Sequence, residues 1–434
     1  MFDQSKAAVQ GNALLFKFTK GLKLNAGAGP NGNIPNVPEI NHVALLGSDY
    51  PSVKFEVKVT EGDEVKSGQI ICVDRDRPEI RFIAPAAGKI SRISYGARRR
   101  LGALVISVEG NGELVFDPEP ASKDRLALRN LLLESGAWTS LRSRPFGHIP
   151  NLDSCPSAIF ITATDSFPLA VNPSEIITAQ SEMFQRGAEA LTRLTDGPVF
   201  VCQVPGPPLI ETHGRLEIVS FSGPHPSGLP GTHIHHLMPV SHQRSVWQIG
   251  YQDVLAIGHL LKTGRIMTKR TLSIGGAGLA KPALISAPLG AKLAELVRHL
   301  TSANSPTLIS GSILSRRDTA YLGRYDLQVT VLERESPVRP VRPFWHRLLD
   351  WLPYSQQKAI IPLEAFERVF PFHILPAPLM RSLAVGDVET AMRLGCLELL
   401  EEDLELLSWL CPSNSDYGAL LRRALESLVE ESGI

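Results

Sequence analysis

Two nearly continuous apolar runs constrain the fold of this chain most. They are SAIFITAT at 157–164 and PVFVCQV at 198–204. Strands that are apolar at almost every position are typical of a parallel sheet that is covered on both faces. The segment between the runs is amphipathic and places four apolar residues on one side of a helix: Ile177, Phe184, Ala188 and Leu191. The three segments therefore predict a strand–helix–strand unit of a Rossmann-like α/β domain.

The region that begins at His42 has a different pattern, in which short strands alternate with turns that contain glycine or aspartate. We expect the strands HVALLG, FEVKV, QIICV, IRFIAP, KISRIS and LVISVEG. Strands of this length predict a small all-β barrel or sandwich. The preceding segment, Asn25–Pro38, is rich in glycine and proline but lacks the strand–helix context of a phosphate loop, so we interpret it as a plain loop.

Helical patterns flank the α/β segments. SKDRLALRNLLLESG at 122–136 predicts a helix that is capped by Ser122 and stopped by Gly136. A second helix is expected from Arg244 to Gly264, because five apolar residues share one stripe: Val246, Ile249, Val254, Ile257 and Leu261. After it, RTLSIGG and PALISAP read as strands, GAKLAELVRHL as a helix, and PTLISG and YDLQVTVLE as strands. Strands around a single helix predict a β-grasp (SLBB-like) module.

The C-terminal part is expected to be helical. ESPVRPVRPFW at 335–345 combines prolines with arginines and is typical of a linker. EEDLELLSWLCP at 401–412 predicts a helix that ends at a proline. SDYGALLRRALESLVEE at 415–431 predicts another helix, capped by Ser415 or Asp416.

These patterns predict a multidomain α/β and α+β chain. We expect an N-terminal extension and loop at 1–40, the β domain at 41–118, the Rossmann-like domain at 119–243, the β-grasp module at 244–334 and a helical domain at 335–434. A chain of 434 residues is too long for one ordinary hydrophobic core, which agrees with several domains.

Charge and cysteine content exclude several classes of protein. Lys+Arg and Asp+Glu both number 44, so the chain lacks the positive surplus of a nucleic-acid binder. No apolar run approaches the ~20 residues that cross a bilayer, so a membrane role would need an integral partner. The five cysteines are scattered without a C-x-x-C pair, which is typical of reduced thiols and excludes a local four-thiolate cluster.

The β domain resembles the biotinyl/lipoyl-carrier fold. The resemblance rests on the turn at Glu61–Asp63, on Gly68 and Gln69, and on APAAGKI at 84–90. In carrier domains a hairpin lysine forms an amide with the cofactor, and the matching residue here is Arg77. A guanidinium stays protonated and is a poor nucleophile, so we expect the carrier fold without a swinging arm.

Several long motifs occur in a fixed order: LLLESGAWTSLRSRPF, GPHPSGLPGTHIH, YQDVLAIGHLLKTG, AYLGRYDLQVTVL and RLGCLELLEEDLELLSWLCP. With these motifs the chain resembles the NqrA family, which comprises the A subunits of the sodium-translocating NADH:quinone oxidoreductase, from about Lys20 to the C-terminus. The resemblance implies a bacterial respiratory complex, a translocase that oxidises NADH, reduces ubiquinone and exports Na⁺.

The same resemblance implies a division of labour in the complex. NADH, FAD, FMN, riboflavin, iron centres and ubiquinone are expected in the complex, but the flavins and iron centres belong to other subunits. This chain would be a non-redox peripheral subunit on the cytoplasmic face of the inner membrane, soluble when isolated and inactive alone. Its main partner would be the B subunit of the complex, the membrane protein that carries flavin and quinone.

A more distant resemblance supplies the alternative function, a NADH- and flavin-binding electron-transfer subunit like those of respiratory complex I and of the Rnf complex. Those relatives place an acidic loop after the first strand, whereas ATDSFPLAVNP holds only Asp165 here and no glycine-rich phosphate loop is present. The C-terminal helix resembles a ferredoxin module in which only Cys396 and Cys411 remain, and two thiolates cannot hold a cubane cluster. We therefore expect this chain to bind no redox cofactor.

The stretch FSGPHPSGLPGTHIHHLMPV at 221–240 is the remaining candidate site and contains four of the twelve histidines. If HIHHLM is a strand, His233 and His235 share a face, but a zinc site needs further ligands from elsewhere. No nucleophile or carboxylate stands at a spacing typical of general-base catalysis, so we expect no catalytic, cofactor-binding or metal-ligating residue. We expect structural histidines, or contact of the loop with a quinone headgroup or a partner protein through Phe221, His225, His233 and His235.

Two further classes stay open on the residues alone. One is a carrier protein with a swinging arm, and the other is a free-standing scaffold unrelated to respiration. The basic turn Arg98–Arg100 is expected to be a solvated hairpin tip or a contact for anionic lipid headgroups or an acidic partner.

Overall fold

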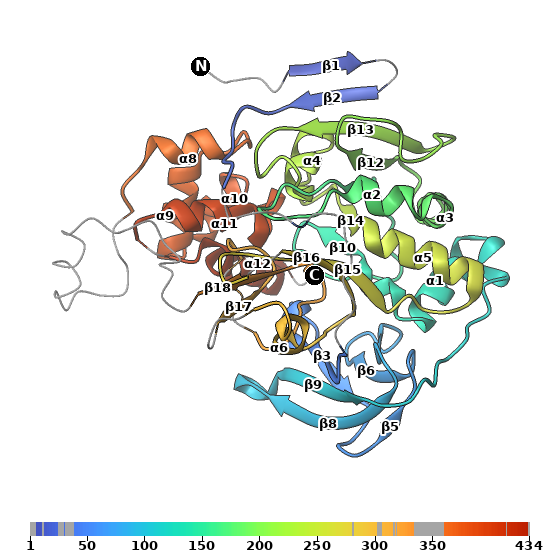
Figure 1. Ribbon diagram of the computed structural model, residues 1–434. Helices are drawn as coiled ribbons and strands as arrows, with labels where there is room; N and C mark the ends of the chain where they lie inside the picture. The colour runs from blue at the N-terminus through green and yellow to red at the C-terminus, as the bar shows by residue number, and fades with distance from the viewer. Residues whose placement is uncertain are drawn as a thin grey trace, which may run out of the picture.

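The computed structural model describes residues 6–10, 13–24, 30, 39–279, 282–301, 306–315, 317, 319–333, 360–413 and 415–432. The predicted linker at 335–345 and nearly all of the loop expected at 25–38 lie outside the described residues. In Figure 1 the N-terminal β unit, which holds β3 to β9, lies at the bottom, and the α/β unit around β11 to β14 lies at the upper right. The C-terminal helices α8 to α12 lie at the left, and the smaller sheet of β15 to β18 lies near the centre.

A seven-stranded sheet forms the largest layer, in the order β1-β2-β13-β12-β11-β14-β10. Its strands are β1 Lys6–Gln10, β2 Ala13–Lys17, β10 Arg142–Arg144, β11 Ile159–Ala163, β12 Val199–Gln203, β13 Leu216–Ser222 and β14 Val246–Gly250. Strand β11 pairs in parallel with β12 and β14, and β12 pairs in parallel with β13. The predicted parallel pair at 157–164 and 198–204 is therefore confirmed.

Helices cover this sheet on both sides. They are α1 Arg125–Glu134, α2 Pro173–Thr178, α3 Ser181–Leu191, α4 Pro230–Leu237 and α5 Tyr251–Thr263. The predicted crossover helix is thus divided into α2 and α3. Helix α1 is capped by Asp124, whose carboxylate accepts from the Ala127 N–H at 2.8 Å, so the expected Ser122 cap is wrong.

Two predictions about chain segments are wrong. The helix expected from Arg244 begins only at Tyr251, because residues 246–250 form β14 between β11 and β10. A short strand that is apolar on both faces and runs directly into a helix mimics one long helical stripe. The expected N-terminal extension is also part of the fold, since β2 pairs in parallel with β13 and Phe16 stacks on Phe221 at 5.2 Å between ring centres.

The N-terminal β unit consists of two small sheets, in agreement with the barrel or sandwich prediction. One has the order β3-β9-β8-β5 and the other β4-β6-β7. The strands are β3 His42–Leu46, β4 Phe55–Val57, β5 Glu64–Val65, β6 Ile70–Asp74, β7 Arg81–Ile83, β8 Gly88–Tyr95 and β9 Leu101–Val108. Arg98–Arg100 are exposed at the turn between β8 and β9, as the sequence predicts.

A second mixed unit follows α5. Its sheet has the order β16-β15-β18-β17, with strands β15 Lys269–Gly275, β16 Ala283–Pro288, β17 Thr307–Ser310 and β18 Gln328–Leu332. One short helix, α6 Leu293–Val297, packs on it. The strands and the helix are where the sequence predicts them, and the β-grasp label stays a prediction.

The C-terminal part is helical, as expected. Its helices are α8 Glu364–Val369, α9 Pro376–Val385, α10 Val388–Arg393, α11 Glu401–Leu410 and α12 Tyr417–Ser432. Asp416 caps α12 by accepting from the Ala419 N–H at 2.9 Å. Cys396 and Cys411 are buried in the apolar core of this unit.

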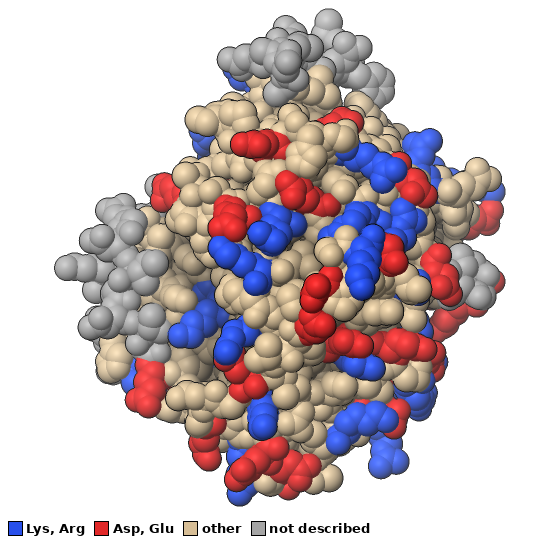
Figure 2. Space-filling model, turned by 90° about the vertical axis from the view of Figure 1, so that its right-hand side faces the viewer, with Lys and Arg blue, Asp and Glu red and all other residues tan. Residues whose placement is uncertain are grey.

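The face of the molecule shown in Figure 2 is of mixed charge. Figure 2 shows Lys and Arg interspersed with Asp and Glu over the face that it presents. Within the described ranges, no helix has the length and apolar character needed to cross a bilayer.

Candidate functional site

A chamber of about 660 Å³ lies at the carboxyl ends of β11 and β14. Thr162, Thr164 and Asp165 enter its lining from the end of β11, and residues 250–253 enter it from the junction of β14 and α5. In open α/β sheets, ligands bind in the crevice outside the carboxyl ends of parallel strands. The chamber is also of the size that small-molecule sites occupy. Position and size therefore make it the candidate site.

Segments far apart in the sequence close this chamber. The N-terminal β unit contributes Asp49, and the second mixed unit contributes Arg317 and Arg324. Helix α11 contributes Glu405, and helix α12 contributes Arg422. The chamber is therefore a property of the assembled fold and of no single unit.

Ion pairs with little solvent contact join the units along one wall. Asp253, in the first turn of α5, accepts from Arg270 at 2.8 Å and from Arg324 at 2.8 Å. Burial alone would raise the pKa of Asp253, but the two guanidinium groups outweigh it and hold that pKa below its usual range. Arg317 pairs with Asp49 of the N-terminal β unit, so the second mixed unit is tied to two others.

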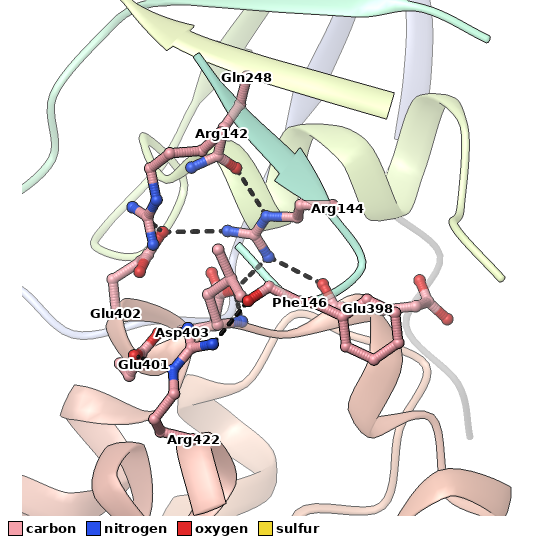
Figure 3. A network of polar contacts seen from close by, with 10 residues as sticks. Arg142, Arg144, Phe146, Gln248, Glu398, Glu401, Glu402, Asp403 and Arg422 are labelled. Atoms are coloured by element: carbon pink, nitrogen blue, oxygen red, sulfur yellow. Dashed lines mark hydrogen bonds and ion pairs between the residues drawn. The ribbon is translucent and has the colours of Figure 1, made fainter. Parts of the chain in front are cut away.

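Arg144 forms a second buried junction, which Figure 3 shows from close by. Its side chain is 0% exposed, and it donates to Gln248 Oε1 at 2.6 Å and to the carbonyl of Glu398 at 2.8 Å. It also donates to Asp403 Oδ2 at 2.7 Å and to Glu402 Oε1 at 3.1 Å. Since Arg144 lies on β10 and its acidic partners on α11, this network fixes the C-terminal helices to the central sheet.

Arg422 of α12 extends the junction. It donates to both carboxylate oxygens of Glu401, at 2.7 and 2.8 Å, and to the carbonyl of Phe146 at 2.6 Å. Two parallel N–H···O bonds to one carboxylate fix direction as well as distance. The start of α11 is thus held by arginines from β10 and from α12 (Figure 3).

The carboxyl groups that line the chamber differ in their pKa. Burial opposes ionisation of Glu402, but Arg142 and Arg144 outweigh it and lower its pKa to about 2. Asp165 has no cationic partner among the described residues, and burial raises its pKa to about 7. Burial, followed by the like charges of Glu402, Asp326 and Asp416, also raises the pKa of Glu405 well above its usual value. The chamber therefore combines fixed charges with carboxyl groups that are easily protonated.

A smaller apolar cavity of about 110 Å³ adjoins the chamber between the N-terminal β unit, α5 and the second mixed unit. The two share part of their lining: Asp49, Ser140, Asp253, Arg270 and Arg324. Beyond these shared residues its wall is largely apolar, with Leu46, Phe82, Ile257 and Met267.

The histidine-rich stretch forms a wall of the chamber, but its histidines face away from it. Gly228, Leu229 and Pro230 line the chamber, whereas His225, His233 and His235 are buried elsewhere. His225 Nδ1 lies 3.1 Å from Ser166 Oγ, and its ring packs on Phe167 at 4.7 Å between ring centres. The peptide bond between His225 and Pro226 is cis.

HIHHLM is largely helical, so the strand reading of this motif is wrong. Residues 230–237 form α4, in which Pro230 takes the first helical position that proline favours. His233 is 0% exposed, contacts the carbonyl of Ser227 through Nε2 at 3.0 Å, and packs on Phe221 at 4.1 Å between ring centres. Phe221 is itself buried under Phe16 and Phe18.

His235 joins α4 to the C-terminal unit. Its Nδ1 lies 2.7 Å from Glu398 Oε2, and its Nε2 accepts from the backbone N–H of His373 at 2.9 Å. His236 contacts the carbonyl of Pro371 at 3.0 Å. These contacts agree with a structural role for the histidines, because they connect α4 to residues 371–398 of the C-terminal unit. Quinone or partner contact by the loop stays a prediction.

The sequence prediction missed the residues that line the chamber. Arg142 of the lining, and Arg144, which pairs with Glu402 of the lining, stand in SLRSRPF, where one serine separates the two arginines and a proline follows. Glu401, Glu402 and Glu405 stand in EEDLELL, which reads as the polar face of an ordinary helix. The tertiary fold brings these two segments together, so no local sequence pattern predicts their place in the chamber wall.

Arg77 has a structural role at the hairpin between β6 and β7. Its guanidinium lies 2.9 Å from Asp74 and donates to the carbonyl of Ile149 at 3.0 Å and to Asn151 at 2.8 Å. The residue that matches the carrier lysine therefore anchors the β unit to the α/β unit.

Comparison with known proteins identifies relatives that match nearly the whole chain. The model of the NqrA N-terminal barrel-sandwich hybrid domain matches residues 16–109, and that of the NqrA second alpha/beta domain matches residues 123–266. The second match includes β14 and α5, in agreement with their place on the central sheet.

The curated relatives share one name, the A subunit of the Na(+)-translocating NADH-quinone reductase. The chain is 39% identical over 454 residues to the protein of this name from Neisseria meningitidis serogroup B, covering 96% of this chain and 100% of that protein. It is 40% identical over 440 residues to the one from Shewanella denitrificans, covering 95% of this chain and 99% of that protein. Among solved structures, an NAD+-reducing [NiFe]-hydrogenase is similar at 13% identity and a TM-score of 0.40 over 72% of this chain and 62% of that one, which is too weak to bear on function.

Proposed function

Because this chain belongs to the NqrA family, the A subunits of the Na⁺-translocating NADH-quinone reductase, we propose that it works as a peripheral, non-redox subunit that docks on the membrane part of that complex. The alternative, an electron-transfer subunit that binds NADH and flavin itself, is not favoured, since the full-length relatives are NqrA proteins. The proposed place is the cytoplasmic face of the inner membrane, against the B subunit of the complex, and the isolated chain is expected to be inactive.

The C-terminal helical unit offers the docking face. Six large apolar side chains are exposed in the described part of the chain. Three of them lie in this unit, where Ile361 is 58% exposed, Leu375 is 51% exposed and Val385 is 69% exposed. The Arg144 and Arg422 junctions hold this unit firmly on the central sheet, so the face is presented as part of a rigid body.

Co-purification tests this docking face. The complex carrying Leu375→Glu and Val385→Glu is extracted in mild detergent, and this chain is expected to separate from the membrane subunits because each change places a charge in an apolar contact. Leu126→Glu on α1 is the matched control, since Leu126 is 55% exposed in a different unit. Retention of the double variant at the level of the control would place the docking face elsewhere.

A contribution to quinone binding by the histidine loop is a second proposal. Its support is that His225 Nε2 is buried without a partner among the described residues, so it could donate to a carbonyl, whereas the free His233 Nδ1 can only accept because Nε2 donates to the Ser227 carbonyl. Neither residue lines either cavity, so a quinone would have to displace part of the loop. Ubiquinone reductase kinetics of the assembled complex with His225→Ala or His233→Ala test this, and unchanged kinetics with intact assembly would remove it.

A further inference from the structure

The hairpin of β8 and β9 concentrates basic residues. Residues 88–108, GKISRISYGARRRLGALVISV, contain no aspartate or glutamate and five basic residues: Lys89, Arg92, Arg98, Arg99 and Arg100. The chain as a whole has equal numbers of basic and acidic residues, so this excess is local. Three of the five follow one another at the turn of the hairpin, where they are exposed. The turn is therefore a point of concentrated positive charge on a chain of zero net charge.

The turn stands clear of the rest of the molecule. Residues 95–100 are all exposed. A Cβ placed on Gly96 would have only the carbonyl oxygen of Arg100 within 4 Å, and that atom belongs to the same turn. Among the described residues, none of the three guanidinium groups of the turn has an ion-pair partner. In Figure 1, β8 and β9 lie near the lower edge of the molecule. The charges are thus available to an external anion.

Carboxylates accompany the hairpin only away from its turn. Glu64 of β5 lies opposite Lys89 in the antiparallel pair of β5 and β8. Glu61 accepts from the backbone N–H of Ile93 at 2.7 Å. A partner that followed the flank of the hairpin would meet these carboxylates. The positive surface is therefore confined to the tip, residues 95–100.

The backbone of the turn does not favour arginine. Arg98 has a φ of 55° and Arg99 a φ of 57°, both in the left-handed region. This region is unfavourable for a residue with a long side chain, whereas glycine and asparagine adopt it readily. The backbone thus gives no reason for arginine at these two positions. What the two residues contribute is the positive charge of their side chains.

The size and chemistry of the tip favour an anionic bilayer over a protein as its partner. A stable protein interface buries about 800 Å² on each partner, from roughly 20–30 residues. The six residues 95–100 are too few for such an interface. A surface of anionic lipids attracts basic residues without a shaped contact. Tyr95 is 59% exposed on the tip, and tyrosine is enriched at the headgroup level of membranes.

We propose that Tyr95 and Arg98–Arg100 bind the headgroups of anionic phospholipids at the membrane surface. This inference rests on the proposed place of the chain at the inner membrane. It adds a contact between the N-terminal β unit and the lipid to the proposed docking of the C-terminal unit on the membrane subunits. Two contacts from separate units restrict how the chain is oriented on the membrane.

Sedimentation of the full-length chain with lipid vesicles tests the proposal. Vesicles of equal parts of phosphatidylglycerol and phosphatidylcholine are compared with vesicles of phosphatidylcholine alone at low ionic strength. We expect binding to the anionic vesicles only, and release when the salt concentration is raised. The triple variant Arg98→Asn, Arg99→Asn and Arg100→Gln should bind about 100-fold more weakly, because each basic residue near such a surface contributes about a factor of five.

Two further variants separate the tip from general effects of charge. Lys123→Gln, Arg244→Gln and Lys269→Gln together remove the same charge from scattered exposed positions, and this control should bind like the unchanged chain. Tyr95→Ser keeps the arginines but removes the ring. It should weaken binding by a smaller factor than the triple tip variant and leave the salt dependence in place.

Three outcomes would overturn the proposal. The first is absence of binding, or equal binding to both kinds of vesicle. The second is equal loss in the tip variant and in the scattered control. The third is loss of the triple tip variant from the detergent-extracted complex, which would show a protein partner for the tip. The Leu375→Glu and Val385→Glu variant should bind vesicles normally, so a failure of the docking proposal is told apart from a failure of this one.

Discussion

Arg144 is a single buried polar residue that connects several parts of this structure. A guanidinium removed from water is tolerated only when its donors are met and its charge is balanced. Arg144 meets both conditions through Gln248, the Glu398 carbonyl and the carboxylates of Glu402 and Asp403. Its neighbour Gly231, in the first turn of α4, is equally constrained, since a Cβ there would overlap the Asp403 carboxylate.

Replacement of Arg144 by methionine is expected to lower the free energy of unfolding by about 3–5 kcal/mol, because the buried carboxylate of Asp403 loses its ion-pair partner and Glu402 keeps only Arg142. Urea unfolding of the full-length chain measures this loss. Arg393→Met is the control, since Arg393 pairs with exposed Glu389 one turn away and its replacement should cost about 0.5 kcal/mol or less. Equal losses in the two variants would contradict the importance of the junction.

Stability should fall at mildly acidic pH because of the buried histidines. Burial lowers the pKa of His225 and of His233 to about 3, whereas an unfolded histidine titrates near pH 6.5. Above about pH 6.5 both states are neutral and the histidines have no effect. As the pH falls below that value, the unfolded chain binds protons that the folded chain cannot, so stability is lost progressively toward about pH 3.

Thermal unfolding between about pH 7.5 and 5.5 checks this dependence. His233→Gln removes the titrating ring but can still donate to the Ser227 carbonyl, so its melting temperature should fall less over that range than that of the unchanged chain. His242→Gln replaces an exposed histidine and should leave the slope as it is. A steeper slope in the His233 variant would contradict the assignment.

At the scale of elements, two helices of the α/β unit touch through glycines. Gly187 of α3 lies against the Val254 carbonyl, and Gly258 of α5 lies against the Met183 carbonyl, so neither has room for a side chain. This contact lets α3 and α5 lie side by side over the sheet, as Figure 1 shows. The pair covers one face of the parallel strands whose ends form the chamber.

Gly258→Ala should therefore destabilise the chain by about 1–3 kcal/mol, because the added methyl group forces the helices apart. The melting temperature of the full-length chain reports this loss. Gly206→Ala is the control, since nothing lies within 4 Å of a Cβ there and the change should stay within about 0.5 kcal/mol. An unchanged melting temperature of the Gly258→Ala variant would show that the two helices can move apart without loss of stability.

Elements with a strong local pattern can be predicted from the sequence. The strands β11 and β12 are apolar throughout, and α12 carries a regular apolar stripe with a cap residue, so the predicted bounds of each lie close to the observed ones. The prediction for residues 246–250 is wrong, because a short apolar segment fits either period and its sheet neighbours decide, and the strand considered for HIHHLM is largely the helix α4. The pairing of β2 with β13 joins distant segments, and no local pattern encodes it.

At the scale of the whole molecule, the units behave as one body. The N-terminal β unit and the α/β unit share one continuous apolar core, and ion pairs of Arg317 and Arg144 tie the second mixed unit and the C-terminal helices to them. Motifs spread along the chain suffice to predict the family. The chamber cannot be predicted in this way, because its lining comes from four units and exists only after they pack.

The central claim is that this chain completes the complex without carrying its redox chemistry. The most direct test is the visible absorption spectrum of this chain after it is released from the purified complex. Flavin and iron absorption is expected to stay with the remaining subunits, and the released chain should be colourless. Flavin or iron absorption that travels with the released chain would contradict the account.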